Sequence, residues 1–465
     1  MSEAGSRPPT VAEVRDAAVE AHRAGRLDEA SELYAAYLAA SPDDGGMWSN
    51  LGALHRVAGR HDLALIAQKR AYALMPRARS ITGNLANILA DTGETERALE
   101  LRRQLLADRP DDPEVIAMMG KALRTLRRYD EAISLLKEAA ERYPDHAEMR
   151  VQLALTLLAA GRYLEGFEAY EARWLTGELA PRRMAMPRWD GSPLDGRTIL
   201  VVPEQGFGDA LAFSRFLPVL KERCGAGRVL LLNNGPVHRL LSQPDGVDAA
   251  ATSMDGAGFD TWCYMMDALP HHFAASPEVP PPTRLHVPDD SRERAVALAA
   301  PARDRFRVGL VWNGSVTYRA NAFRSFSHRE YWPLLDLPDT QFYGLHKGPM
   351  AEEMRKDGTA TLLHDVARTE RDFADTAAMM RELDLVVTTC TATAHLAGSL
   401  GVPAWVLLHW DSFWMWGADG ETTPWYPSVR LIRQETPRDW AGVIARVRSG
   451  LEQELDRWRK ARAHG

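Results

Sequence analysis

Cysteine is scarce in this chain of 465 residues, which contains only Cys224, Cys263 and Cys390. No two of them form a CxxC pair, and this excludes a zinc ribbon and a disulfide framework. No window approaches the ~18 uninterrupted apolar residues that indicate a membrane-spanning helix. The first residues also lack the apolar segment of a signal peptide, so we expect a cytoplasmic protein without a membrane span.

An excess of basic residues is also missing, because 56 Lys and Arg stand against 63 Asp and Glu. Binding to nucleic acid or to an anionic membrane surface requires a basic footprint, so we expect neither partner. Hydrophobic residues make up 45% and charged residues 26%, which is ordinary for a globular protein. At ~100–200 residues per domain, the length indicates about two to four domains.

A repeat of 34 residues runs through the first part of the chain. Three residue types recur with this spacing, at Pro42, Pro76, Pro110 and Pro144, at Ala30, Ala64, Ala98 and Ala132, and at Gly25, Gly59 and Gly93, with Gly161 two periods further on. This period is that of the tetratricopeptide repeat, a helix–turn–helix unit that stacks into an α-solenoid. We therefore predict a repeat domain over residues 11–180, with units 11–44, 45–78, 79–112, 113–146 and 147–180.

One position of each repeat faces the groove of such a solenoid, and it is held by Asp16, Asn50, Asn84, Met118 and Gln152. Asn and Gln can donate to and accept from a peptide main chain without reading its sequence. The pattern resembles the asparagine ladder of the protein O-GlcNAc transferase superhelix. We expect Asn50, Asn84 and Asn87 to contact a polypeptide. The alternative is that these polar side chains are only solvated.

The pattern changes after the repeats. Residues 181–197 are rich in Pro, Gly and Arg and predict an ordered linker anchored by Trp189. Short apolar runs then alternate with helical stretches, which predicts parallel α/β sheets. We expect one lobe over 198–300 and a second over 301–465, with a proline-rich boundary near 275–290 and a charged amphipathic helix at 437–463. The strand candidates are 198–203, 228–232, 307–312, 341–345, 383–388 and 404–408.

The loop after the first predicted strand contains Gly206, Gly208 and Asp209. The two glycines allow a close approach of the backbone to a ligand, and ligands bind beyond the carboxyl ends of such strands. Asp209 is a candidate general base toward an attacking hydroxyl. The alternative is that Asp209 only caps the following helix.

The loops after two further strands contain Asn313, Arg319 and Arg324, and then Lys347. Arginine side chains match the geometry of phosphate oxygens, so this region is a candidate anion site. The alternative is a solvated loop, with Lys347 as an ordinary surface lysine.

A fourth loop holds Cys390, Thr391, Ala392, Thr393 and His395 at the start of a helix of small residues. Free N–H groups and the helix dipole make such a start a candidate phosphate site, with His395 one turn in. The alternative for His395 is a structural role. No Cys-His-Asn arrangement supports Cys390 as a nucleophile. Aromatic residues between 405 and 426 are candidates for stacking on a base or sugar, or for packing between the lobes.

Taken together, several motifs resemble those of bacterial tetratricopeptide-repeat proteins that carry a heptosyltransferase-like glycosyltransferase domain, similar to flagellin glycosyltransferases. The motifs are Glu204-Gln205-Gly206-Phe207-Gly208-Asp209, Val308-Gly309-Leu310-Val311-Trp312-Asn313-Gly314, Asp372-Phe373-Ala374-Asp375-Thr376-Ala377, Thr393-Ala394-His395-Leu396-Ala397-Gly398 and Pro424-Trp425-Tyr426-Pro427. The resemblance covers almost the whole chain after residue 10.

This resemblance implies a GT-B fold of two Rossmann-like lobes, with a metal-independent, inverting active site in the cleft between them. It implies no cofactor, only a nucleotide-sugar substrate such as a CMP-, UDP- or ADP-sugar, held mainly by the second lobe. Asp209 matches the family's general base, and His395 joins it as a catalytic candidate. The phosphate-binding candidates are Gly206, Gly208, Asn313, Arg324, Lys347, Cys390, Thr391, Ala392, Thr393 and His395. The family has Asp where Cys390 stands, and this difference argues against an ADP-heptose donor.

The resemblance also implies an O-glycosyltransferase that moves a sugar, for example a nonulosonic acid such as pseudaminic acid, onto Ser or Thr of a protein such as flagellin. The repeats would recruit that protein. Two alternatives stay open. One is transfer onto lipopolysaccharide or capsule glycans, and the other is a non-catalytic adaptor with a decayed transferase domain.

Overall fold

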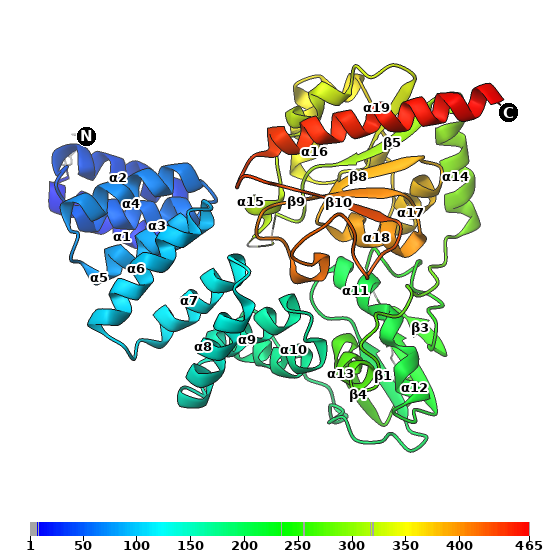
Figure 1. The fold of residues 1–465 in the computed structure, drawn as a ribbon, viewed down its shortest axis with the longest axis horizontal. Helices are drawn as coiled ribbons and strands as arrows, with labels where there is room; N and C mark the ends of the chain where they lie inside the picture. The colour runs from blue at the N-terminus through cyan, green and yellow to red at the C-terminus, as the bar shows by residue number, and fades with distance from the viewer. Residues whose placement is uncertain are drawn as a thin grey trace, which may run out of the picture. The chain divides into compact units, whose positions relative to one another are not determined.

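The computed structural model describes residues 7, 9–233, 235–253, 256–316, 318 and 320–464 (Figure 1). The chain forms two compact units, of which the first ends at Thr156 and the second begins at Leu157. No helix among the described residues is long and apolar enough to cross a membrane.

Each predicted repeat contains one pair of helices, which confirms the helical repeats. The pairs are α1 (Val11–Arg23) with α2 (Leu27–Ala40), α3 (Gly45–Val57) with α4 (His61–Leu74), α5 (Arg79–Asp91) with α6 (Thr95–Asp108), α7 (Pro113–Thr125) with α8 (Tyr129–Arg142), and α9 (Ala147–Ala159) with α10 (Tyr163–Ala169).

Small residues set the distance between paired helices. A methyl group on Gly52 of α3 would lie 2.7 Å from Nε2 of Gln68 on α4, and one on Gly120 of α7 would lie 2.6 Å from Leu136 on α8. The helices cross closely at these points because nothing larger fits. The turn between paired helices uses left-handed backbone, as at Gly59 (φ 72°). Arg127 occupies the same position of the fourth repeat with φ 61°, so this turn keeps the left-handed backbone although it lacks the glycine that favours it.

The second unit contains a parallel sheet of four strands in the order β3-β2-β1-β4. The strands are β1 (Thr198–Val202), β2 (Arg228–Leu232), β3 (Ala249–Ala251) and β4 (Thr261–Tyr264). The predicted linker packs along β4, where Trp189 N donates to Trp262 O at 2.7 Å. Trp189 is buried, as expected for an aromatic anchor.

A second parallel sheet follows, with six strands in the order β10-β9-β8-β5-β6-β7. Its strands are β5 (Phe306–Val311), β6 (Thr340–Gly344), β7 (His364–Asp365), β8 (Leu385–Thr389), β9 (Ala404–Leu408) and β10 (Val429–Arg433). The prediction of parallel α/β sheets is therefore confirmed. All six predicted strands coincide with observed strands within two residues at each end, whereas β3, β4, β7 and β10 were not predicted.

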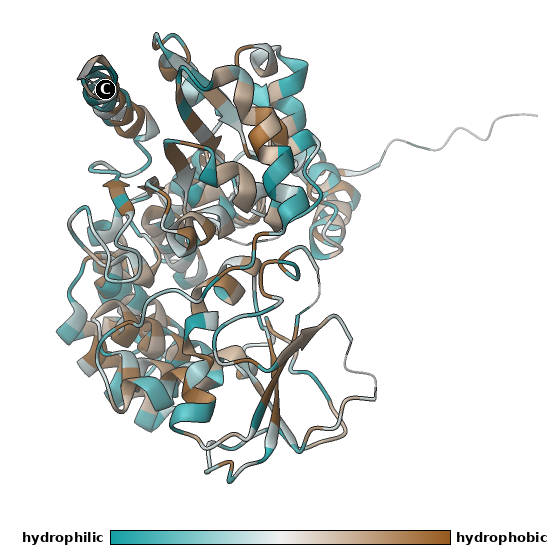
Figure 2. Cartoon of the chain, turned by 90° about the vertical axis from the view of Figure 1, so that its right-hand side faces the viewer, coloured by the Kyte–Doolittle hydropathy of each residue, from teal (hydrophilic) through white to brown (hydrophobic). Residues whose placement is uncertain are grey.

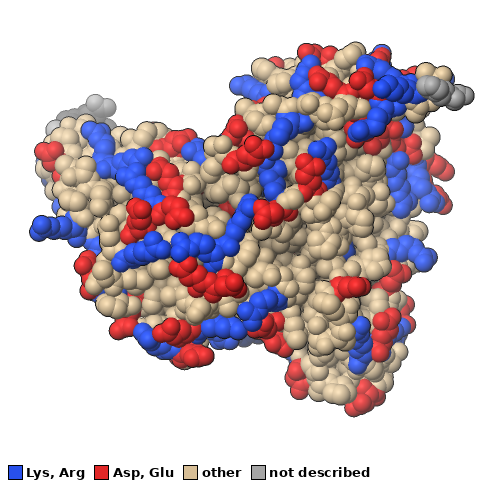
Figure 3. All heavy atoms as spheres, viewed as in Figure 1, with Lys and Arg blue, Asp and Glu red and all other residues tan. Residues whose placement is uncertain are grey.

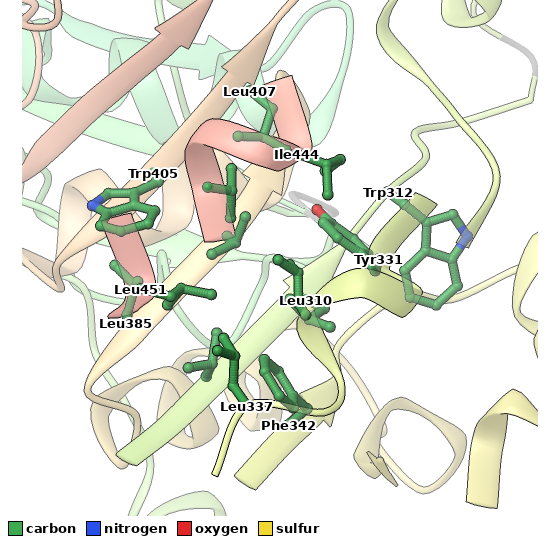
Figure 4. Close-up of a cluster of buried hydrophobic side chains, with 14 of the residues drawn as sticks. Leu310, Trp312, Tyr331, Leu337, Phe342, Leu385, Trp405, Leu407, Ile444 and Leu451 are labelled. Carbon is green, nitrogen blue, oxygen red and sulfur yellow. The ribbon is translucent and has the colours of Figure 1, made fainter. Parts of the chain in front are cut away.

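The helix α19 (Trp440–His464) covers one side of the core of the six-stranded sheet and lies beside the strands in Figure 1. Ile444 and Leu451 of α19 pack against strand residues such as Leu310 and Leu407 (Figure 4). In Figure 2 much of the strand surface is hydrophobic, while hydrophilic residues lie mostly on the outer sides of the helices. Burial of this apolar surface is the main force that holds the unit together.

The fifth repeat ends inside the second unit. The ring of Phe167 on α10 stacks on Phe273 with centroids 5.7 Å apart, and Tyr163 lies 4.9 Å from Phe273 and 6.0 Å from Trp414. These contacts agree with a last repeat that docks onto the next domain. The short helix η1 (Tyr170–Leu175) continues directly from α10.

Candidate functional site

Two loops that are far apart in the sequence meet in the second unit. The helix α11 (Phe207–Phe213) follows β1, the helix α18 (Ala392–Leu400) follows β8, and the two helices are in contact (Figure 1). A methyl group on Gly208 would lie 2.8 Å from Cδ2 of His395 and 3.3 Å from Cα of Ala392. The structure thus brings the first and the last of the predicted loops together.

Asp209 lies in the first turn of α11, where its Oδ2 accepts a hydrogen bond from Gly206 N at 2.9 Å. Asp209 therefore does help to cap α11, as the alternative from the sequence held. The residue is half-buried, so one part of it stays accessible. Burial raises the pKa of Asp209 to about 6, against the opposing effects of the Gly206 N–H and of Arg324. A carboxylate with this pKa takes up a proton near neutral pH more readily than an ordinary aspartate.

Arg324 ends the short helix α15 (Asn321–Arg324) and lies beside the same loops. Its Nη1 donates to Cys390 O at 2.7 Å, and its guanidinium group lies 4.3 Å from the ring centre of Tyr318. Asn313 holds this group indirectly, because Asn321 Nδ2 donates to Asn313 Oδ1 at 3.0 Å and Arg324 Nε donates to Asn321 Oδ1 at 3.3 Å. Arg319 lies outside the described residues.

The start of α18 has an unusual cap. Thr391 is the N-cap residue, but its hydroxyl makes no hydrogen bond to the helix. Oγ1 is buried and has no partner among the described residues. Threonine is a preferred N-cap because its oxygen accepts from the helix N–H groups, so a buried hydroxyl left unpaired here is costly. A bound anion or an ordered water would satisfy it.

Other buried polar atoms without a partner follow the neighbouring strands of the six-stranded sheet. In the part of the chain that the structure describes, they are Trp312 Nε1 after β5, His346 Nε2 after β6, Thr389 Oγ1 at the end of β8, and His409 Nδ1 and Trp410 Nε1 after β9. Buried polar groups in proteins are normally hydrogen-bonded. The carboxyl edge of a parallel sheet is also where ligands bind, so these atoms mark this edge as a candidate binding site.

His395 is buried in a packed cluster. Its Nδ1 shares a hydrogen bond of 3.1 Å with the Tyr426 hydroxyl, and its ring stacks on Trp416 at 5.3 Å. Burial, with a further contribution from the positive charges of Arg215 and Arg324, lowers the pKa of His395 to about 3. The ring is therefore neutral and part of the packing around α18. A catalytic or phosphate contact of His395 stays a prediction.

Cys390 contributes to the site through its backbone. Its carbonyl accepts from Arg324, while its Sγ accepts from Trp416 Nε1 at 3.0 Å. Burial raises the pKa of the thiol, which agrees with the argument against a nucleophilic cysteine. The nearby Trp414, Trp416, Trp425 and Tyr426 are buried, as expected for packing.

Lys347 lies after β6, where its Nζ donates to Glu370 O at 2.9 Å and lies 3.6 Å from Glu370 Oε2. Burial raises the pKa of Glu370 to about 7, although Lys347 opposes the rise. The ammonium group thus has a local partner, and its predicted contact with phosphate stays a prediction.

The asparagines of the repeats brace neighbouring helices. Asn84 Nδ2 donates to Ser49 Oγ at 3.0 Å, and Asn87 Oδ1 accepts from Arg102 Nη2 at 3.1 Å. Asn50 Nδ2 donates to Met47 Sδ at 3.8 Å. Each amide keeps one polar atom outside these bonds, so contact with a polypeptide stays a prediction.

Several residues of this region were not singled out from the sequence. Glu204 forms a buried ion pair with Arg173, whose Nη2 lies 2.8 Å from Glu204 Oε2, and Gln205 Nε2 donates to Tyr170 OH at 3.4 Å. The only signal was the position of Glu204 and Gln205 inside the first motif. Their partners on η1 could not be predicted, because no regular spacing in the sequence relates η1 to this motif.

Neither the charge on the face drawn in Figure 3 nor the arrangement of metal-binding side chains marks a further site among the described residues. Lys and Arg alternate with Asp and Glu over the described residues of the face drawn in Figure 3. Among the described residues, no group of three or more His, Cys, Asp or Glu side chains is arranged to hold a metal ion.

A family model agrees with the repeats, and several known proteins are similar to parts or most of this chain. The model of the tetratricopeptide repeat family matches residues 15–79 and 117–182. Protein FlbA of Caulobacter vibrioides is 29% identical in an alignment that covers 93% of this chain and 76% of FlbA. Among solved structures, a MamA structure (MamA MSR-1 C2) is 23% identical and covers 36% of this chain and 95% of MamA, with a TM-score of 0.31. A tetratricopeptide repeat protein from Parabacteroides merdae is 21% identical and covers 36% of this chain and 74% of that protein, with a TM-score of 0.31.

Proposed function

We propose that this protein is a GT-B glycosyltransferase that moves a sugar from a nucleotide-sugar to a Ser or Thr hydroxyl of a polypeptide, with flagellin as the first candidate acceptor. The observation that carries the proposal is the convergence of three groups in the second unit. They are the half-buried carboxylate of Asp209, the guanidinium group of Arg324 and the unpaired N-cap hydroxyl of Thr391.

Asp209 supplies the base. The acceptor hydroxyl attacks the anomeric carbon of the sugar, its proton passes to Asp209, and the bond between that carbon and the phosphate oxygen breaks. With a pKa of about 6, Asp209 is ionised at neutral pH and yet holds the proton better than an ordinary aspartate.

Arg324 and the start of α18 stabilise the leaving group. The negative charge that develops on the phosphate meets the guanidinium group, the Thr391 hydroxyl and the N–H groups of the first turn. Such charge stabilisation is commonly the largest contribution to catalysis. The unpaired atoms after β5, β6 and β9 are candidates for contacts with the rest of the nucleotide.

The repeats support a protein acceptor, because solenoids of this kind bind extended polypeptide. We propose that Asn50, Asn84 and Asn87 contribute to this binding. The sugar is proposed to be a nonulosonic acid such as pseudaminic acid, since Cys390 stands where the resembling family has its sugar-binding aspartate.

The test is co-expression of the full chain with flagellin and measurement of the intact mass of the flagellin. The wild type should add a sugar mass, and Asp209→Asn should reduce transfer by about 10²–10⁴-fold. Asp456→Asn on the outside of α19 is the matched control and should behave as the wild type. Purified protein is also incubated with CMP-, UDP- and ADP-sugars to measure hydrolysis of the sugar donor.

The outcomes separate the alternatives. Mass added to a glycan but not to flagellin would favour transfer onto lipopolysaccharide or capsule. Absence of both transfer and hydrolysis would favour a non-catalytic adaptor that uses only its repeats.

A further inference from the structure

The helix η1, which leaves the last repeat, carries Tyr170 onto the loop that holds Asp209. The Tyr170 hydroxyl accepts from Gln205 Nε2 at 3.4 Å. Gln205 stands between Glu204 and Gly206, and the Gly206 N–H binds the Asp209 carboxylate. Tyr170 and Gln205 are therefore next to the proposed base, although Tyr170 precedes Asp209 by 39 residues in the chain.

A buried ion pair fixes this contact. Arg173 is only 4% exposed, and it donates to both carboxylate oxygens of Glu204. The same guanidinium group donates to Tyr170 O at 3.0 Å and lies 5.1 Å from the centre of the Tyr170 ring. Burial lowers the pKa of Arg173, but the carboxylates of Glu204 and Glu171 outweigh this effect and raise it. One residue thus holds both η1 and the loop.

The backbone conformation of Gln205 also indicates that the contact between Gln205 and Tyr170 belongs to a ligand site. Its φ of 58° lies in the left-handed region, which is strained for a residue other than glycine. Such conformations persist where the surrounding structure holds them, and they cluster at ligand sites. Gln205 itself is exposed.

Tyr170 and Gln205 together offer one hydrogen-bond donor and one acceptor, which is what a peptide group requires. Gln205 uses its Nε2 on Tyr170, which leaves Oε1 as an acceptor. The Tyr170 hydroxyl accepts that bond, so its own proton is left to donate, and none of the residues that the structure describes accepts it. Burial raises the pKa of Tyr170 to about 12, and the nearby carboxylate of Asp209 adds to the rise, so this proton is kept at physiological pH.

We infer that Tyr170 and Gln205 bind one peptide group of the acceptor polypeptide, next to the residue whose hydroxyl faces Asp209. In this arrangement Tyr170 donates to the peptide carbonyl oxygen and Gln205 Oε1 accepts from a peptide N–H. The inference rests on the proposed function and deepens it. It makes the substrate a polypeptide at the catalytic centre itself, and not only in the repeats.

The experiment uses the full chain with flagellin as the acceptor and compares Tyr170→Phe and Gln205→Gly with the wild type. Loss of one hydrogen bond should lower kcat/KM for the polypeptide about tenfold, mainly through KM, in each variant. Hydrolysis of the sugar donor by water needs no peptide group and should stay within twofold of the wild type. Tyr163→Phe, whose ring packs in the aromatic cluster of α10, is the matched control and should change neither rate.

Gln205→Gly also guards against misfolding, because glycine adopts the left-handed backbone without strain. Polypeptide transfer within twofold of the wild type in both variants would overturn the inference while leaving the proposed function intact. An equal loss of transfer and hydrolysis would overturn it as well, because the two residues would then serve the fold or the sugar donor. Absence of transfer in the wild type, or full transfer in Asp209→Asn, would instead overturn the proposed function.

Discussion

Gly208 on α11 leaves no room for a side chain against His395 on α18, since a Cβ would lie 2.8 Å from the Cδ2 atom of that buried ring. His395 cannot easily move away, because it is stacked on Trp416 and bonded to Tyr426. The close approach of the two loops therefore depends on the absence of one methyl group.

Replacement of Gly208 by valine should force the two helices apart. We expect a loss of ~1–3 kcal/mol in the free energy of unfolding, as for overpacked cores, and weaker binding of nucleotide-sugars. Chemical denaturation and calorimetric titration measure the two effects. Gly258→Val is the matched control, because a Cβ at Gly258 meets no atom within 4 Å. Equal stability of the two variants would contradict the tight contact at Gly208.

Thr391→Val tests the unpaired hydroxyl. Removal of a buried polar atom that lacks a partner should leave the stability of the free protein unchanged or slightly higher. If the hydroxyl binds a phosphate oxygen, the affinity for nucleotide-sugars should fall about tenfold. Thr388→Val is the control, since its hydroxyl already donates to Thr389 O at 3.0 Å. A stability loss in Thr391→Val without a change in affinity would show that the hydroxyl serves the fold.

The pH dependence of transfer should reflect Asp209. Only the ionised carboxylate accepts a proton, so kcat/KM should fall as the pH drops below about 6, the pKa of Asp209 in the folded protein. A pH–rate profile measures this limb, and an inflection near the ordinary value of 3.8 would contradict the raised pKa.

The same shift predicts a change in stability. Because the folded protein holds the Asp209 proton more tightly than the unfolded chain does, the free energy of unfolding should decrease as the pH rises from about 4 to about 6. Above that range the ionised form persists and the loss remains. Asp209→Asn should therefore melt at a higher temperature than the wild type at pH 7, and at pH 3 the difference should vanish.

Arg173→Met should be the most destabilising of these changes. It leaves the buried Glu204 carboxylate without its cation, which costs ~3–5 kcal/mol when one partner of a buried pair is removed. Arg162→Met breaks a pair with Glu165 in which both side chains are about 40% exposed, and such surface pairs contribute ~0–1 kcal/mol. Similar unfolding free energies for the two variants would contradict the role of the Arg173–Glu204 pair.

The repeats, two strands of the four-stranded sheet and four strands of the six-stranded sheet could be predicted because their signals are local. The 34-residue spacing of Pro, Ala and Gly reports one helix pair at a time, and strands such as β1 and β9 are runs of apolar and β-branched residues. The strand β3 is three alanines, which do not favour strands, and β4 has only the four residues Thr-Trp-Cys-Tyr, too short to stand out as a strand in the sequence. Their pairing with β2 and β1 depends on the sheet that they join.

The sequence predicted which loops form the candidate site, but it did not predict which side chains contact one another there. Gly208, Asp209 and Thr391 stand at strand–helix junctions that the sequence marks clearly. The state of His395 depends on Trp416 and Tyr426, which lie 21 and 31 residues further on. The pairing of Arg173 with Glu204 joins a repeat to a sheet, and no periodicity links such positions.

The inclusion of α10 in the second unit has a practical consequence for how this chain can be divided. A fragment beginning at β1 would remove Tyr163 and Phe167 and leave Phe273, Trp414 and Trp425 uncovered, an apolar surface prone to self-association. Exchanges of whole repeats between relatives are better made upstream of Leu157, where α10 keeps its aromatic neighbours and the array can lengthen or shorten freely.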